Sequence, residues 1–277
     1  MLPIDQIICG DNCDVLGTFP RECIDLVVTS PPYDDLRTYG GHAWDFYGVA
    51  WQLKRVLKPG GVIVWVVADQ TKDGSESGTS FQQALHFKRL GLRLHDTMVW
   101  EKVNTGGARG SNKAYWQAFD FMFVFSSGGV SRGSLIEDRR NAKGGMTYTT
   151  GGKRNADGTT TPNRSMCLAE FGRRTNVWRI DTADVGGLHP APFPEDLAAD
   201  HIRSWSNEGD IVLDPFNGSG TTTKMARELG RHWIGIDVNE EYCEIARRRM
   251  AQQLLPGMGP PVSVSVGGPD SVSCPSA

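Results

Sequence analysis

The sequence predicts an α/β protein with a doubly wound, mostly parallel sheet. Short apolar runs rich in Val and Ile alternate with segments of helical periodicity, and these runs are apolar throughout instead of alternating with polar residues. Strands that are apolar on both faces are typical of parallel sheets covered by helices on both sides. A chain of 277 residues, 39% of them hydrophobic, can bury such a core in one large domain.

The expected elements follow one another in strand and helix order. Strands are expected at residues 5–10, 24–30, 61–69, 93–100, 119–127, 210–216 and 231–238, all rich in β-branched and aromatic residues. Helices are expected at residues 44–57, 80–90, 194–205, 221–229 and 239–254, where apolar residues recur every three or four positions. The sequence LKPGG after the first helix ends it, because Pro cannot continue a helix and Gly favours the turn that follows.

Residues 126–176 interrupt this order. The segment is rich in Gly, Thr, Asn and Arg and too long for an ordinary connection, so it is either a functional insertion or disordered. Between Glu101 and Arg179 there are 13 Lys and Arg against 6 Asp and Glu, whereas the rest of the chain carries 16 against 26. A basic segment in a protein of net charge −3 suits a polyphosphate backbone, although a solvated surface would show the same charge.

Composition disfavours several classes of protein. The longest apolar run, Val62 to Ala68, is far shorter than the roughly 20 residues of a membrane span. The segment MLPIDQIICG lacks the basic and apolar regions of a signal peptide, so a cytoplasmic protein with no membrane partner is expected. The six cysteines form no CxxC pair and have no His-rich partner segment, so reduced thiols and no metal site are expected.

The segment DIVLDPFNGSGTTTKMAREL predicts a ligand site. A buried strand ends at Asp214, a Gly-rich turn follows, and a helix begins near Thr221, which places free N–H groups beside a closely approaching backbone. Neither phosphate motif fits, because Thr223 stands where a dinucleotide fingerprint needs its third Gly and Lys224 has the wrong spacing for a P-loop. A turn that merely joins strand to helix is the alternative.

A second acid indicates what this site binds. The next strand ends at Asp237, where a carboxylate is placed to accept hydrogen bonds from ribose hydroxyls. Asp214 would repel a pyrophosphate and suit a cation. S-adenosylmethionine combines a ribose and an adenine with an ammonium and a sulfonium, so it is the predicted cofactor.

The strand at residues 24–30 ends abruptly in the sequence SPPY. The exocyclic amine of a nucleobase is a poor nucleophile because its lone pair is delocalised into the ring, and acceptors aimed at its N–H bonds would draw it toward a tetrahedral form. Ser30 Oγ and the Pro31 carbonyl are candidate acceptors, held rigid by the proline rings, and Tyr33 could stack on an extruded base. These roles require the SPPY segment to lie beside the strand that ends at Asp214. A Pro-Pro loop beside a core tyrosine is the alternative.

Taken together, the segments TSPPY, LDPFNGSGTT, HPAPFP and RHWIGIDVNEEYCEIARRR resemble the amino-methylating DNA methyltransferases of restriction-modification type. The resemblance extends to about Leu255, and the catalytic segment precedes the cofactor loop, as in the beta group. It implies a Rossmann-like fold with a seven-stranded sheet, helices on both faces and one reversed strand at 119–127. It also implies a catalytic half at 1–125, a target-recognition insert at 126–176 and a cofactor-binding half at 177–255, with a disordered tail at 256–277.

The resemblance further implies roles for single residues. The catalytic tetrapeptide would be Ser30, Pro31, Pro32 and Tyr33, with Asp11 beside the adenine and residues 192–194 beside the methionine part of the cofactor. The full set of expected cofactor contacts is Asp11, Thr29, Pro192, Phe193, Pro194, Asp214, Pro215, Phe216, Gly218, Ser219, Gly220, Thr221, Asp237 and Val238. Contacts with double-stranded DNA are expected from Lys102, Arg109, Lys113, Arg139, Arg140, Lys143, Arg173 and Arg174.

Ser30 bears on the target base. In the family that the chain resembles, Asp or Asn before the prolines usually accompanies methylation of adenine N6, and Ser more often accompanies cytosine N4, so cytosine N4 is favoured and adenine N6 is the alternative. An RNA base, a protein amide, or a binder without activity are further alternatives that methyl-transfer and product analysis distinguish. The resemblance also admits a homodimer and a separately acting cognate restriction endonuclease as partners.

Overall fold

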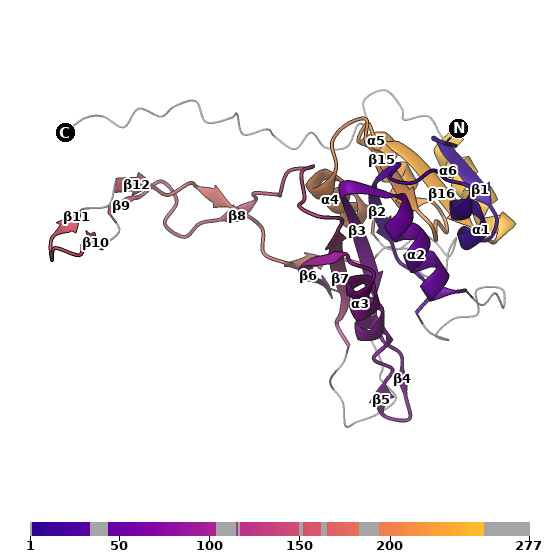
Figure 1. The fold of residues 1–277 in the computed structure, drawn as a ribbon, viewed down its shortest axis with the longest axis horizontal. Coiled ribbons are helices and arrows are strands. Elements are labelled where there is room, and N and C mark those ends of the chain that lie inside the picture. Colours follow the sequence, from indigo (N-terminus) through magenta and orange to yellow (C-terminus); the bar gives the residue numbers. More distant parts are fainter. Residues whose placement is uncertain are drawn as a thin grey trace.

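The computed structural model describes residues 2–33, 44–103, 115, 117–149, 152–161, 165–182 and 194–251. An eight-stranded sheet forms its centre, and a long narrow arm projects from one side (Figure 1). The strand order is β1 (Gln6–Cys9), β16 (His232–Asp237), β15 (Ile211–Asp214), β2 (Ile24–Thr29), β3 (Leu57–Val67), β7 (Phe119–Ser126), β6 (Arg93–Lys102) and β14 (Val177–Ile180).

The sheet is parallel except for β7, which is antiparallel to both of its neighbours. This confirms the predicted mostly parallel sheet and its reversed strand, and all seven predicted strands are present. β14 is an additional strand at the edge of the sheet, where Trp178 pairs with Trp100 of β6. β14 was not predicted, because its four residues directly follow an irregular segment and are too few to show a periodic pattern.

Helices cover both faces of the sheet. On one face lie α1 (Asn12–Gly17), α2 (Phe46–Val56) and α3 (Thr79–Arg89), and on the other lie α4 (Glu195–Trp205), α5 (Thr221–Glu228) and α6 (Glu240–Ala251). Successive strand residues point to opposite faces, so Val27 and Ile63 pack with the first group while Leu26 and Val64 pack with the second. The site therefore rests on strands that are packed on both sides.

The helix boundaries agree with the predicted ones to within a few residues. α2 ends at Val56, before Pro59, as the sequence LKPGG indicates, and β3 begins at once with Leu57. The six-residue helix α1 was not predicted, because it is too short for a periodic pattern. A small hairpin of β4 (Thr71–Lys72) and β5 (Ser75–Glu76) precedes α3.

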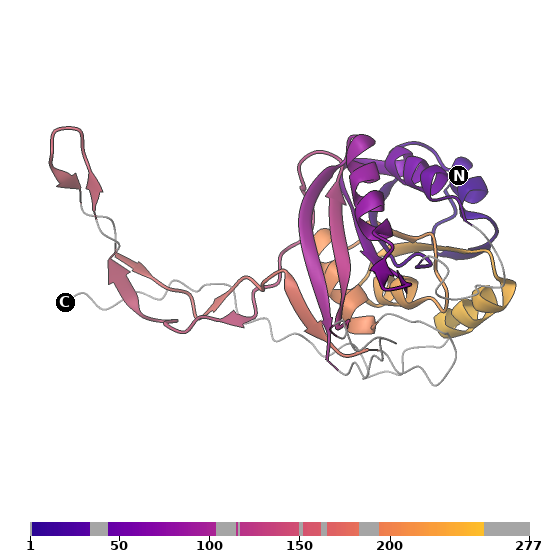
Figure 2. The same ribbon diagram turned by 90° about the horizontal axis from the view of Figure 1, so that it is seen from below.

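The arm is an irregular antiparallel hairpin within the predicted insert at 126–176 (Figure 2). Its pairings are β8 (Arg139–Arg140) with β13 (Phe171–Gly172), β9 (Thr147–Thr149) with β12 (Ser165–Cys167), and β10 (Lys153–Arg154) with β11 (Thr160–Thr161). The first residues of the predicted insert pack on the body instead, where Arg132 forms ion pairs with Asp25 and Asp210. The predicted insert is thus an anchored segment followed by a projecting one.

Candidate functional site

The two predicted segments meet at one edge of the sheet. β2 and β15 are parallel neighbours, with Leu26 paired to Val212 and Val27 to Leu213, so both strands end at the same edge. From this point the chain continues from β2 to β3 on one side and from β15 to β16 on the other. Such a reversal of strand order leaves a crevice beyond the strand ends, where ligands bind in open α/β sheets. The adjacency that the predicted chemistry requires is therefore present.

A buried hydrogen bond joins the two segments. Thr29 Oγ1 donates to Asp214 Oδ1 at 2.6 Å, and the Phe216 N–H donates to the same oxygen at 3.1 Å. Asp214 is 2% exposed, and burial raises its pKa to about 6, although the hydrogen bonds that it accepts oppose this rise. Asp214 thus organises the start of the glycine turn from inside the protein.

The second acid holds the middle of the glycine turn. The Gly218 N–H donates to Asp237 Oδ2 at 2.8 Å, and the Asn239 N–H donates to Oδ1 at 2.9 Å. Gly220 is the N-cap residue of α5 with a φ of +83°, and a Cβ there would lie 3.0 Å from the Ala246 Cβ. Glycine is required at this position because the left-handed backbone and the close approach of α6 both disfavour a side chain.

The charges at this edge fit a cationic nucleoside better than a polyphosphate. Burial is the main cause of the raised pKa of Asp214, and the negative charge of Asp237 adds to the rise. A carboxylate has about four lone-pair positions, so the backbone bonds to Asp237 are compatible with a ribose contact. Two acids beside a glycine turn would repel a pyrophosphate.

The tetrapeptide follows β2 directly and forms a chain of polar contacts. Ser30 Oγ lies 3.0 Å from Tyr33 Oη, which lies 3.3 Å from Asp120 Oδ2. The other carboxylate oxygen of Asp120, Oδ1, is 2.7 Å from Lys102 Nζ. Sequence analysis did not identify Asp120, although an acid within the apolar segment FDFMFVF was a usable signal, since buried charges need partners.

Trp44 is a second residue that sequence analysis did not identify. Its ring meets the Phe216 ring nearly edge-on, with 4.9 Å between centroids, and lies 6.3 Å from the Trp65 ring. Phe216 belongs to the turn after Asp214, so this aromatic group forms a wall at the start of the glycine turn. A tryptophan just before a helix matches no motif, and only the packing identifies it.

Two predicted cofactor residues have structural partners. Asp11 follows β1 and caps α1, where its carboxylate accepts from the Cys13 and Asp14 N–H groups at 2.8 and 3.2 Å. The Pro215 carbonyl accepts from Asn12 Nδ2 at 3.2 Å. These contacts fix the end of β1 against the glycine turn, and the adenine contact predicted for Asp11 stays a prediction.

The glycine turn is also tied to α4 and α6. Arg249 donates to the Ser219 carbonyl at 2.7 Å and to its hydroxyl at 3.0 Å, and its other terminal nitrogen donates to Glu195. Glu195 is the first residue of α4 and follows Pro194. Of the remaining predicted cofactor residues, Thr221 is buried at the start of α5, Val238 is 43% exposed after β16, and Pro192 and Phe193 lie outside the described residues.

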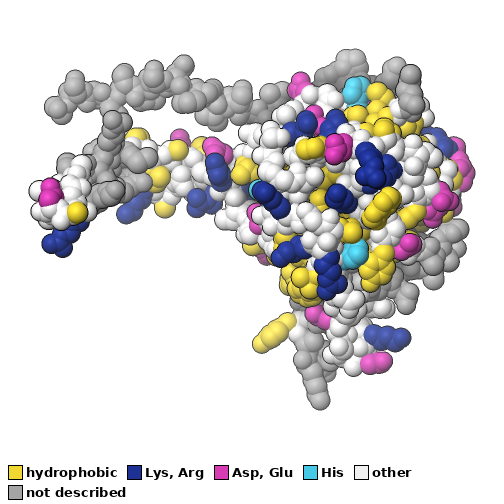
Figure 3. Space-filling view, viewed as in Figure 1, with side chains coloured by type: hydrophobic (Ala, Val, Ile, Leu, Met, Phe, Trp, Pro, Cys, Tyr) yellow, Lys and Arg dark blue, Asp and Glu magenta, His cyan; other side chains and the backbone are white. Residues whose placement is uncertain are grey.

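The predicted DNA contacts fall into separate groups. Arg139, Arg140, Lys143 and Arg173 are exposed on the arm, and Figure 3 shows Lys and Arg side chains along its visible face. Lys102 is instead paired with the buried Asp120. Arg109 and Lys113 lie outside the described residues.

Arg174 anchors the arm to the body. Its guanidinium forms ion pairs with Asp138 and Asp200 and lies 5.1 Å from the Trp178 ring. The hydrogen bond to Asp138 raises the pKa of Arg174 above its usual range and lowers the pKa of that carboxyl. A guanidinium engaged by two carboxylates has a structural role, so we expect Arg174 and the paired Lys102 to contribute less to DNA binding than the exposed residues of the arm, and their DNA contacts stay predictions.

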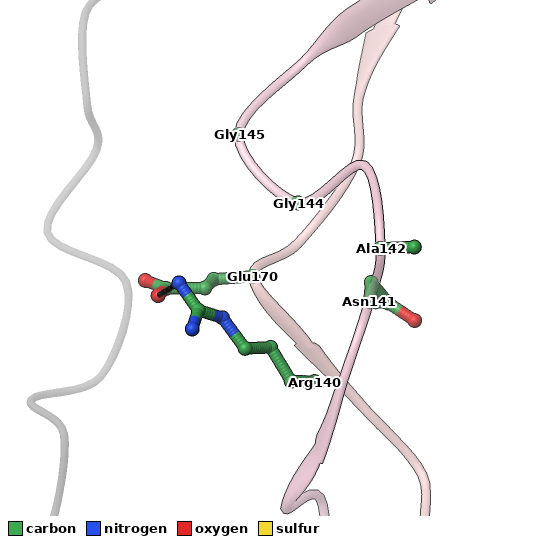
Figure 4. Close-up of a pocket in the computed structure, with 6 residues that line it drawn as sticks. All are labelled: Arg140, Asn141, Ala142, Gly144, Gly145 and Glu170. Carbon is green, nitrogen blue, oxygen red and sulfur yellow. Dashed lines mark ion pairs between the residues drawn. The ribbon is translucent and has the colours of Figure 1, made fainter.

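An open hollow of about 320 Å³ lies on the arm (Figure 4). Arg140 and Glu170 point toward each other beside it as an exposed ion pair at 3.8 Å. The turn opposite is closed by the Gly145 N–H, which donates to the Leu168 carbonyl at 2.8 Å. The hollow is lined by residues of the arm and by none of the tetrapeptide or the glycine turn, so it is separate from the site at the sheet edge.

The described part of the chain contains no group of three or more His, Cys, Asp or Glu side chains that could hold a metal ion. Within the same residues, every helix is too short or too polar to cross a membrane. The groups gathered at the sheet edge are the carboxylates of Asp214, Asp237 and Asp120, the hydroxyls of Thr29, Ser30 and Tyr33, the Lys102 ammonium and aromatic rings. Such a set can bind a nucleoside and orient an amine.

Comparison with known proteins gives matches over most of the chain. A family model described as DNA methylase (N6_N4_Mtase) matches residues 24–248. The orphan methyltransferase M.BamHII of Bacillus amyloliquefaciens is 49% identical over 241 aligned residues, covering 84% of this chain and 90% of the relative. The type II methyltransferase M.SmaI of Serratia marcescens is 26% identical over 289 aligned residues, covering 90% of this chain and 91% of the relative.

Solved structures share the fold. PvuII DNA methyltransferase (cytosine-N4-specific) superposes with a TM-score of 0.63 at 22% identity, covering 90% of this chain and 87% of that one. TTHA0409 of Thermus thermophilus, in complex with S-adenosyl-L-methionine, superposes with a TM-score of 0.60 at 25% identity, covering 89% and 94%. The Rossmann-like arrangement predicted for the chain is therefore confirmed.

Proposed function

The chain belongs to the DNA methylase family N6_N4_Mtase, and from this premise we propose that it transfers the methyl group of S-adenosylmethionine to the exocyclic N4 amine of cytosine in DNA. One observation carries the proposal. The amine-orienting corner at Ser30 to Tyr33 and the glycine turn after Asp214 end neighbouring strands, and the Thr29–Asp214 hydrogen bond of 2.6 Å joins them.

The residues of the sheet edge suit S-adenosylmethionine, the cofactor present in the related TTHA0409 complex. When bound, this cofactor supplies a methyl carbon on a cationic sulfur, so that an N–C bond forms while the C–S bond breaks and leaves its electron pair on sulfur. Asp237 would accept from the ribose hydroxyls, and the glycine turn would allow close approach of the backbone. Asp214 and Asp237 both accept from backbone N–H groups of the glycine turn, and two acids there favour a positively charged ligand.

The tetrapeptide would prepare the amine. Ser30 Oγ and the Pro31 carbonyl would accept hydrogen bonds from its two N–H groups, which would free the nitrogen lone pair from the ring for attack on the methyl carbon. After attack the nitrogen is cationic and loses one proton through its acceptor to water. The target base must first leave the duplex, and stacking on Tyr33 would offset part of the few kcal/mol that flipping costs.

The choice of cytosine depends on Ser30. A serine hydroxyl is a shorter acceptor than the Asp or Asn side chain that usually accompanies adenine N6 methylation in this family. To reach acceptors of different length, the amine of the smaller pyrimidine and the amine of the purine need different placements of the flipped base. Adenine N6 is the second candidate, because the hydroxyl could also accept from an adenine amine.

The arm would engage the DNA. Arg139, Arg140, Lys143 and Arg173 project from it into solvent, where phosphate contacts are accessible. The hairpin reaches well beyond the sheet, so it could follow a groove while the sheet edge receives the extruded base (Figure 2). Base-specific contacts within this predicted target-recognition insert would then determine the recognition sequence.

A methyl-transfer assay tests the proposal. The purified chain is incubated with unmethylated genomic DNA and S-adenosylmethionine that carries a tritiated methyl group, and the nucleosides are then analysed by mass spectrometry. We expect label in the DNA and N4-methylcytosine among the nucleosides. N6-methyladenine would overturn the choice of base alone, whereas the absence of label from the DNA would overturn the choice of DNA.

Ser30→Ala tests the acceptor role. We expect kcat to fall by about tenfold or more, since one positioned hydrogen bond is lost, while the dissociation constant of S-adenosylmethionine stays nearly the same. Wild-type turnover in this variant would count against Ser30 as an acceptor.

A homodimer and a cognate restriction endonuclease stay predictions, and analytical ultracentrifugation would test the former.

A further inference from the structure

Asp120 is an unusual residue for its position. It lies near the start of β7, it is 2% exposed, and Phe119 and Phe121 flank it in the strand. A buried carboxylate is costly unless it is paired, and Lys102 pairs with it at 2.7 Å. The pair stabilises a negative charge two strands away from β2, at the edge where the tetrapeptide lies. Packing alone gives no reason for a charge there.

The second oxygen of Asp120 sets the direction of a hydrogen-bond chain. An ionised carboxylate only accepts hydrogen bonds, so the Tyr33 hydroxyl, 3.3 Å away, must donate to it. The Tyr33 oxygen then accepts from the Ser30 hydroxyl, which is 3.0 Å away. The hydrogen of Ser30 is thereby directed toward Tyr33, and the other side of its oxygen presents lone pairs.

This direction matters for the proposed chemistry. A serine hydroxyl that rotates freely can turn its hydrogen toward the lone pair of the target nitrogen, which would occupy the electrons that must attack the methyl carbon. A hydroxyl held by Tyr33 can only accept from the amine N–H. Resting on the proposed methyl transfer, we propose that Asp120 is a positioning residue that acts through Tyr33 to keep Ser30 an acceptor.

Asp120→Asn tests this role, because the amide has nearly the same shape and can also donate, which removes the fixed direction. We expect kcat to fall by about tenfold or more, while the dissociation constant of S-adenosylmethionine and the KM for DNA change by less than about threefold. A kcat within about threefold of wild type would overturn the inference. Activity of the wild-type chain is measured first: its absence overturns the proposed function itself, whereas an active wild type with an equally active Asp120→Asn overturns only the inference.

Tyr33→Phe provides an independent variant that keeps the ring and introduces no buried charge. It should lower kcat to a similar extent, and this test holds even if Asp120→Asn does not fold. If the two residues act through one chain, the double variant should be no slower than the slower single variant within about twofold. Wild-type turnover of Tyr33→Phe, or losses that multiply in the double variant, would overturn the inference.

Asp25→Asn is the matched control for the loss of a buried ion pair. Asp25 is 1% exposed and pairs with Lys58 at 2.7 Å and with Arg132 at 3.0 Å, but it lies near the start of β2, at the opposite edge of the sheet. This variant should lose thermal stability and retain kcat. An equal loss of kcat in Asp25→Asn would indicate that buried carboxylates affect turnover through stability alone and would overturn the positioning role.

Discussion

The unfolding free energy of the Asp214→Asn variant should increase relative to that of wild type as pH rises. Burial raises the pKa of Asp214 to about 6 from its ordinary value of 3.8, so the unfolded chain loses this proton at lower pH than the folded protein does. The resulting cost to folding is absent well below pH 3.8, grows as pH rises through the window from 3.8 to about 6, and is constant above it. Asparagine does not titrate and has no such cost.

The two pKa values give the expected size. The cost to wild-type folding is about 1.6 kcal/mol at pH 5 and about 3 kcal/mol at pH 8, at about 1.36 kcal/mol per pKa unit. The difference in unfolding free energy between Asp214→Asn and wild type should therefore increase by about 1.4 kcal/mol from pH 5 to pH 8, in favour of the variant. Changes that do not depend on pH, such as weaker acceptance from Thr29, cancel in this comparison.

Urea unfolding followed by tryptophan fluorescence at both pH values measures this difference. Thr29→Val is the companion variant, because it removes a donor that lowers the pKa of Asp214. It should lose about 1–3 kcal/mol of unfolding free energy at pH 8 and less at pH 5. A difference between Asp214→Asn and wild type that stays constant with pH, or that falls as pH rises, would refute a raised pKa for Asp214.

Four further predictions concern the cofactor site and the arm. Gly220→Ala should lower the unfolding free energy by about 1–3 kcal/mol through backbone strain and contact with Ala246, as thermal unfolding would show, and a wild-type melting temperature would contradict this. Asp237→Ala should weaken S-adenosylmethionine binding by about 1–3 kcal/mol in calorimetry, and an unchanged dissociation constant would count against the ribose contact. Arg174→Gln should lower the unfolding free energy by about 1–2 kcal/mol because Asp138 and Asp200 lose their partner, with little change in DNA affinity. Arg140→Ala should instead leave stability within about 0.5 kcal/mol and reduce the slope of log DNA affinity against log salt by about 1, so equal slopes would remove Arg140 from the phosphate contacts.

Local sequence patterns were sufficient to predict seven of the eight strands of the sheet and the segments that end at its edge. The seven predicted strands and five predicted helices are present because apolar periodicity, prolines and glycines act over a few neighbouring residues. Gly220 illustrates this, since the predicted turn has the left-handed backbone that only glycine adopts readily. The acids that end β15 and β16 were likewise visible as strand ends.

Which of these residues become partners depends on the folded chain and could not be predicted from local patterns. Thr29 and Asp214 are 185 positions apart, and Tyr33 and Asp120 are 87 apart, so no local pattern links them. Their contacts arise because β2 lies between β15 and β3, and because the reversed β7 brings Asp120 to the same edge as Ser30. Arg174 shows the converse, since its charge suggested DNA, whereas the fold placed Asp138 and Asp200 beside it. Residue type fixes what a side chain can bind, but strand order determines which groups are close enough to be bound.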